Sequence, residues 1–98
     1  MPCNLTNAVN EFLPDYPIDE DKLVREYYAW DQLGTDFMCA NGLGHLSLWD
    51  LLGMDPARAF IMARTDCGIG LSDDWNQGKE YRCCEMLDRA AKVCGVFI

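Results

Sequence analysis

The sequence predicts a mainly α-helical, compact single domain over residues 1–98, with four or five short helices, glycine-rich loops and little or no sheet. Three observations lead to this fold class. Apolar side chains recur at helical spacing in several segments, and residues that start or stop helices flank those segments. No segment alternates polar with apolar residues over more than a few positions. Half of the 98 residues are hydrophobic, which is enough for one small core.

The first predicted helix precedes two prolines. Asn4 or Thr6 is its candidate N-cap, because both side chains can accept a hydrogen bond from a free backbone N–H group at a helix start. The helix is expected to end near Leu13, since Pro14 and Pro17 disfavour its continuation.

The second predicted helix covers about residues 19–32 and has a broad aromatic face. Leu23, Tyr27 and Trp30 follow one line along it, at i, i+4 and i+7. Acidic residues at its start are favoured by the helix macrodipole. Gly34 is the expected stop.

Two further helices are predicted in the middle of the chain. Residues 35–44 are expected to form either a tight loop or a short helical start that packs Cys39 and Ala40 inward. Residues 47–53 have the pattern of one capped helical turn with a glycine stop. Residues 55–64 begin with an Asp-Pro pair, the favoured order at a helix start, and are expected to form a helix.

The closing helix is predicted from about Gly78 to Cys94. One face carries small or apolar residues at helical spacing, and charged residues occupy much of the other side. Gly95 is the expected left-handed stop. The predicted buried stripe consists of Cys83, Leu87, Ala90, Ala91 and Cys94.

The chain is acidic, and its charge is uneven. The net charge is -8, with eight acidic and two basic residues in positions 1–38 but three acidic and four basic residues in positions 76–98. Ordinary binding to nucleic-acid phosphates is driven by Lys and Arg, so direct nucleic-acid binding is not expected. An acidic surface attracts basic proteins, although the same charge also serves solubility alone.

A cytoplasmic location is expected. Residues 1–13 contain no basic region followed by an apolar run, so no secretory signal is predicted. No stretch approaches the roughly 20 apolar residues that span a membrane. The six cysteines are therefore expected to be reduced and partly buried rather than paired as disulfides.

No residue set predicts a catalytic, metal or cofactor site. His45 is the only histidine, and its pairing with Cys39 as a nucleophile is weighed against simple packing, which we favour. The cysteines lack the paired spacing of a zinc site, and the acids at 19–21 lack the alternation of a calcium loop. The chain is therefore predicted to be non-enzymatic.

Trp75 and Asn76 form the most informative local cluster. With His45 they are the candidate lining of a small-ligand or nucleotide pocket, which is the alternative function. The competing interpretation, which we favour, places Trp75 in the core at the entrance of the last helix.

Short motifs suggest a family likeness over about residues 23–94. They are Trp30-Asp31-Gln32, Cys39-Ala40-Asn41-Gly42-Leu43 and Trp75-Asn76, followed by the closing helix. With these motifs the sequence resembles a family of short uncharacterised phage and actinobacterial proteins. Gln77 stands where that family has Asp. The resemblance implies a compact helical fold and a phage or mobile-element origin, and it carries no activity.

The leading functional hypothesis is a protein-binding module. Its specific form is an inhibitor of a host nucleic-acid-handling or defence complex, acting in the host cytoplasm on a protein with a basic surface. The residues expected to contact that partner are the acids of the front end: Asp15, Asp19, Glu20, Asp21 and Glu26.

Overall fold

The computed structural model describes residues 1–65 and 79–95, and these residues form five α-helices and no strand. The predicted fold class is confirmed. The radius of gyration of 12.9 Å is close to the roughly 12.6 Å expected of a compact domain of this length. In chain order the helices are α1 (Cys3–Phe12), α2 (Glu20–Ala40), α3 (Leu48–Leu52), α4 (Pro56–Arg64) and α5 (Lys79–Val93).

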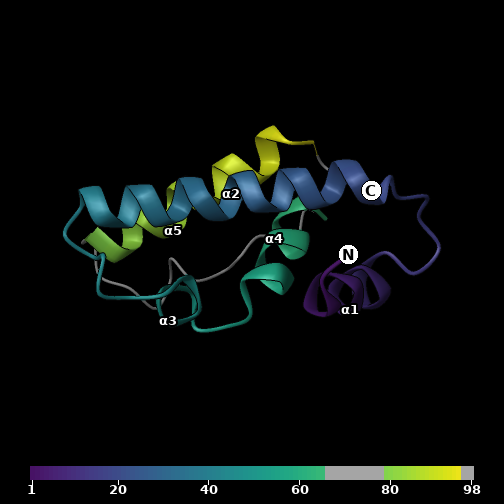
Figure 1. Cartoon of the computed structure of the whole chain (residues 1–98), viewed down its shortest axis with the longest axis horizontal. Coiled ribbons are helices and arrows are strands. Elements are labelled where there is room, and N and C mark those ends of the chain that lie inside the picture. The colour runs from purple at the N-terminus through teal and green to yellow at the C-terminus, as the bar shows by residue number, and fades with distance from the viewer. Residues whose placement is uncertain (66–78, 96–98) are drawn as a thin grey trace.

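The short helix α4 lies at the centre of the arrangement. It packs against each of the other four helices, and α5 lies alongside the long helix α2 (Figure 1). Alanines at three positions of α4 allow this close approach, because they present little side-chain volume to the neighbours. The fully buried residues of α4 include Ala59, Phe60, Ile61 and Ala63. A helix that is apolar on nearly all sides is typical of a core position.

Helix α1 begins earlier than the sequence predicts. It starts at Cys3, after Pro2, and neither proposed residue caps it. The Thr6 hydroxyl donates a hydrogen bond to the Pro2 carbonyl at 3.2 Å, while the amide of Asn4 faces Asp55 at 3.5 Å. Both side chains therefore act as donors here, and the N-cap prediction was wrong.

Helix α2 continues well beyond Gly34, so the predicted stop was wrong. Gly34 is buried, and a Cβ atom built on it would lie 2.6 Å from Leu87 Cδ2 and 3.1 Å from Leu48 Cδ2. The glycine thus permits close packing between helices rather than ending one. The helix ends at Ala40, just before Gly42 with its positive φ of 75°.

The segment after Gly34 also differs from expectation. Its first six residues belong to α2, and the loop is confined to about residues 41–47. Cys39 and Ala40 are exposed rather than packed inward. The buried residues of this segment are Met38 and Leu43, which are 2% and 5% exposed.

The predicted limits of α3 and α4 are confirmed. The Ser47 hydroxyl accepts a hydrogen bond from Asp50 N at 3.1 Å, and Gly53 ends α3 with a φ of 69°. The Asp55 carboxylate accepts from Ala57 N at 3.0 Å, with Pro56 in the first turn of α4.

Helix α5 completes the core, as its pattern predicts. Cys83, Leu87 and Ala91 are fully buried, and Gly95 follows the helix with a positive φ of 115°. The predicted loop around residues 65–77 lies almost entirely outside the described residues.

Candidate functional site

Four carboxylates cluster around the start of α2. Asp15, Asp19, Glu20 and Asp21 are all exposed, and no basic residue lies between the first and the last of them in the sequence. We call these four residues the acidic edge. Pro14 and Pro17 disfavour helical structure between α1 and α2, and the connecting segment lies at the surface. Asp15 lies in the turn after α1, and the other three carboxylates lie at the start of α2.

The acidic edge is not neutralised within the described part of the chain. None of its four carboxylates forms an ion pair with another described residue. Asp19 has a structural role, because it caps α2 by accepting a hydrogen bond from Lys22 N at 3.2 Å. The other three carboxylates present their charge to solvent.

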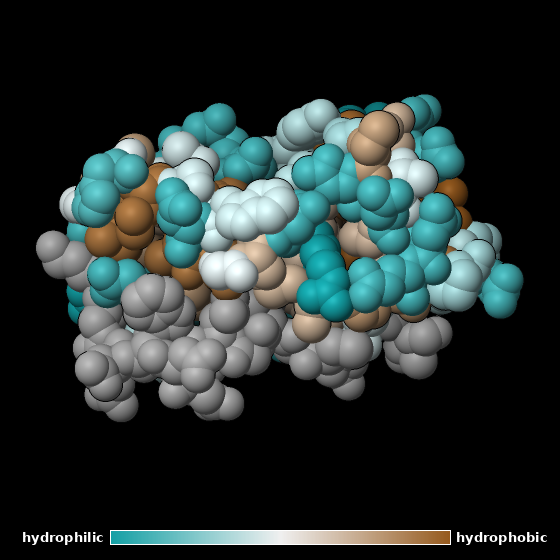
Figure 2. All heavy atoms as spheres, turned by 90° about the horizontal axis from the view of Figure 1, so that it is seen from below, coloured by the Kyte–Doolittle hydropathy of each residue, from teal (hydrophilic) through white to brown (hydrophobic). Residues whose placement is uncertain are grey.

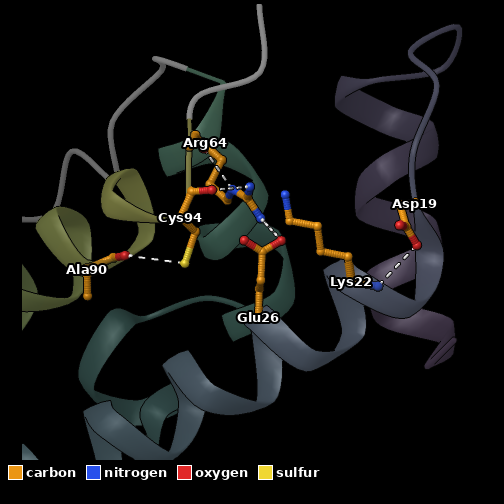
Figure 3. A network of polar contacts seen from close by, with 7 residues as sticks. Asp19, Lys22, Glu26, Arg64, Ala90 and Cys94 are labelled. Atoms are coloured by element: carbon orange, nitrogen blue, oxygen red, sulfur yellow. Dashed lines mark hydrogen bonds and ion pairs between the residues drawn. The ribbon is translucent and has the colours of Figure 1, made fainter.

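Glu26, the fifth predicted contact residue, lies in a different environment. Its Oε1 atom lies 3.2 Å from Nη1 of Arg64, and its side chain is only 18% exposed. Figure 3 shows the Glu26 carboxylate pointing at the Arg64 guanidinium rather than away from the protein. The structure therefore separates Glu26 from the four residues of the acidic edge.

Arg64 is a buried charged residue that the sequence reasoning did not single out. It is 2% exposed, and its Nε and Nη2 atoms donate to the carbonyl oxygens of Gly95 and Cys94 at 2.9 and 3.0 Å. Its guanidinium also lies 5.3 Å from the centre of the Phe60 ring. We call the contacts of Arg64 with these groups and with Glu26 the Arg64 clamp, because they tie α2 and α4 to the end of α5 (Figure 3).

A small pocket lies between the acidic edge and the Arg64 clamp. Its lining includes Tyr16, Pro17, Lys22 and Glu26, and its volume is about 240 Å³. Pockets for drug-sized ligands span roughly 300–1,000 Å³. The pocket is thus too small to favour a nucleotide.

The alternative ligand site stays a prediction. Trp75 and Asn76 lie outside the described residues, and His45 is exposed in the loop after α2. Cys39 is also exposed, and no hydrogen bond joins it to His45 in the part of the chain described.

The described thiols are free, and they differ in environment. Cys3 and Cys39 are exposed, whereas Cys83 and Cys84 are buried. Burial raises the pKa of Cys84 to about 11 and raises the pKa of Cys83 as well. The pKa of Cys94 is also raised by burial, and its Sγ lies 3.6 Å from the Ala90 carbonyl. High pKa values make buried thiols poor nucleophiles at neutral pH.

The surface differs between the two ends of the molecule. In the view from below, hydrophobic residues gather toward the end where α2 finishes and α5 begins, and hydrophilic residues predominate toward α1 (Figure 2).

Within residues 1–65 and 79–95, no helix has the length and apolar character to cross a membrane. No group of three or more metal-ligating side chains occurs in these same ranges.

Comparison of the chain with protein-family models, with curated proteins and with solved structures finds no match. The resemblance to short phage and actinobacterial proteins therefore stays a prediction.

Proposed function

We propose that this chain is a small non-enzymatic module that binds another protein through its acidic edge. The observation that carries the proposal is the exposure of Asp15, Glu20 and Asp21 without ion-pair partners among the described residues. Clustered carboxylates of this kind attract a complementary basic surface and steer its approach. The partner is therefore a protein with exposed Lys and Arg.

The acidic edge also has the support that a binding surface needs. Asp19 fixes the start of α2, and two turns further on Glu26 holds that helix to the buried Arg64. A charged surface on a fixed helix loses less conformational entropy on binding than the same charges on a loose segment.

The finer form of the proposal is an inhibitor of a host nucleic-acid-handling or defence complex, acting in the host cytoplasm. Two points support it. The short motifs resemble those of phage proteins, and a net charge of -8 suits the basic grooves in which such complexes hold nucleic acid.

The test is capture of a partner from host lysate, followed by titration of the purified partner. The double variant Glu20→Lys with Asp21→Lys is expected to weaken binding by at least about tenfold, since each lost charge pair contributes on the order of 1 kcal/mol. Asp19 is left unchanged because it caps α2.

The matched control is Asp36→Lys with Glu80→Lys, which changes the net charge equally away from the acidic edge. It is expected to bind the partner with an affinity close to that of the unaltered chain. Equal weakening by both double variants would mean that total charge, rather than the acidic edge, governs binding. Affinity should also fall as salt is raised from 0.05 to 0.5 M, as a test condition, because exposed charges are screened.

A further inference from the structure

A hollow lies in the connection between α1 and α2, at one end of the molecule (Figure 1). Its volume is about 340 Å³, at the small end of the roughly 300–1,000 Å³ range of pockets that hold organic ligands. This size suits one long side chain of a partner better than a whole helix or strand. We call it the Asp15 hollow, and its lining consists of Phe12, Leu13, Pro14, Asp15, Tyr16 and Pro17.

The walls of the Asp15 hollow are held in place by the chain around them. The Leu13 side chain is buried at 7% exposure, and the Leu13 carbonyl accepts a hydrogen bond from Tyr16 N at 3.3 Å. Pro14 and Pro17 each have a fixed φ, which limits the conformations open to the segment. A preformed hollow loses less conformational entropy when a side chain enters it.

The lining combines one carboxylate with two aromatic rings. Asp15 is the only charged residue of the lining, is exposed, and forms no ion pair within the described ranges. Tyr16 is 40% exposed, and Phe12 is partly buried against the core. A carboxylate beside an aromatic ring favours a cation, because the carboxylate supplies the opposite charge and the ring face also attracts positive charge.

The fold already binds one guanidinium with the same combination of groups. The guanidinium of Arg58 lies 5.3 Å from the centre of the Phe12 ring, and its Nη2 and Nε atoms donate to Glu11 at 3.0 and 3.1 Å. In the sequence, Glu11 directly precedes Phe12, just as Asp15 directly precedes Tyr16. Because Arg58 is paired with Glu11, its charge is balanced there, and Asp15 can pair with a cation from outside the described chain.

We propose that the Asp15 hollow receives an arginine side chain of the basic partner protein, with the guanidinium paired to Asp15 and stacked on Tyr16. This inference deepens the proposed function and rests on it, because Asp15 belongs to the acidic edge. Arginine is preferred to lysine, since its planar guanidinium is less strongly hydrated, pairs with a carboxylate through two nitrogens and stacks on aromatic rings. The rest of the acidic edge attracts positive charge of either kind, and the Asp15 hollow selects arginine.

The experiment uses the full chain and two fluorophore-labelled peptides of equal charge. Each peptide contains lysines separated by glycines, and the two differ only in having arginine or lysine at the central position. The arginine peptide is expected to bind about two to five times more tightly by fluorescence anisotropy, which is the factor that an exposed cation–π contact supplies. Equal affinities would overturn the proposal.

Variants of Tyr16 locate the preference for arginine. Tyr16→Leu is expected to abolish it, whereas Tyr16→Phe retains it because the aromatic ring remains. Tyr28→Leu is the matched control, since Tyr28 is 54% exposed and lies outside the lining, and it is expected to retain the preference. A preference that survives Tyr16→Leu would overturn the proposal. Circular dichroism checks that each variant keeps its helical content.

A second pair of variants tests the carboxylate. Asp15→Asn is expected to weaken binding of the arginine peptide by at least about fivefold, because the guanidinium loses its charged partner. Asp36→Asn removes an exposed carboxylate of α2 outside the hollow and is expected to weaken binding by less than about twofold. Equal effects of the two substitutions would mean that Asp15 contributes only to the overall charge, which would overturn the proposal.

The two proposals fail in different ways. If both peptides bind equally well and Glu20→Lys with Asp21→Lys weakens both, the acidic edge binds basic partners and only the arginine assignment is wrong. If neither peptide binds, or if that double variant leaves both affinities unchanged, the acidic edge is not a binding surface and both proposals are wrong.

Discussion

The indole nitrogen of Trp30 donates a 2.8 Å hydrogen bond to the backbone carbonyl of Leu87, which lies 57 positions later in the chain. This bond joins α2 to the middle of α5, and Trp30 also packs against the ring of Phe60 at 5.1 Å between centroids. One side chain therefore connects the three helices that form most of the core.

Trp30→Phe is expected to lower the free energy of unfolding by at least about 1 kcal/mol, because the buried carbonyl loses its bond and the smaller ring leaves unfilled space. Urea unfolding followed by circular dichroism measures the change. Trp49→Phe is the control, since Trp49 is 54% exposed. A loss of similar size in both variants would contradict the assigned role of Trp30.

Gly34→Ala tests the close approach of α2 and α5. Alanine favours a helix over glycine by about 1 kcal/mol, but the added Cβ would lie 2.6 Å from a fully buried leucine side chain. Overpacking costs about 1–3 kcal/mol, so the variant is expected to be less stable than the unaltered chain.

The double-mutant cycle with Leu87→Ala identifies the cause. Removing the Leu87 side chain creates a cavity and destabilises the protein, but Gly34→Ala in that background is expected to be neutral or stabilising. If Gly34→Ala costs the same in both backgrounds, the contact with Leu87 is not the reason that this position holds glycine.

Arg64→Ala is expected to lower the free energy of unfolding by about 3–5 kcal/mol, because it leaves Glu26 and two backbone carbonyls without their cation. Arg64→Lys is expected to rescue this only in part, since an ammonium group cannot reproduce the planar fork of guanidinium donors. Thermal unfolding measures both variants.

The matched control is Arg58→Ala. Arg58 forms a bidentate pair with Glu11 at 3.0 and 3.1 Å, but both side chains are about half exposed. Its removal is expected to change stability far less than removal of Arg64. Equal losses would mean that burial does not determine the importance of the Arg64 clamp.

Alkaline pH is expected to destabilise the fold. Burial raises the pKa of Cys84 to about 11 and, with the nearby Asp31 charge, the pKa of Tyr27 to about 12. Unfolded cysteine and tyrosine lose their protons near pH 8.5 and about 10, so the folded state holds more protons above these values and stability falls as pH rises.

Urea unfolding between pH 8 and 11 is the measurement. The decline is expected to begin at about pH 8.5 from the thiols and to steepen above about pH 10 from Tyr27. Tyr27→Phe should remove the steeper part. A free energy of unfolding that stays constant over this range would contradict the buried positions of both groups.

The accessible thiols can be counted directly. In a Cys67→Ser background, Cys3 and Cys39 are expected to react with a disulfide reagent at pH 8 at least about a hundredfold faster than Cys83 and Cys84, which require opening of the core. In denaturant all of the cysteines should react rapidly. Fast reaction of Cys83 or Cys84 in the folded protein would show that α5 is not packed as described.

Features with local causes could be predicted from the sequence. Ser47 and Asp55 satisfy backbone groups within three residues of themselves, and Gly53 adopts a conformation that its own lack of a side chain permits. The acidic edge could be predicted for a similar reason, because exposed carboxylates beside chain breaks need no distant partner.

Features that depend on distant partners could not be predicted. Glycine is the residue type that most often ends a helix, so Gly34 was predicted as a stop. Only the position of Leu87 shows why α2 continues through it. Glu26 belongs to the same acidic stretch as the acidic edge, but Arg64 lies 38 positions away and draws it into the protein. A charged residue directly after the apolar run of residues 59–63, at i+4 from Phe60, was the available signal for Arg64.

The Arg64 clamp has a consequence for the order of events during protein synthesis. Glu26 leaves the ribosome well before Arg64, but the Cys94 carbonyl that Arg64 binds is made 30 residues after it. At about 5–20 residues per second, translation needs roughly 2–6 seconds to cover that distance. Helices α2 and α4 are therefore translated before the Arg64 clamp can close, and the nascent chain acquires its final packing only after the end of α5 has been translated.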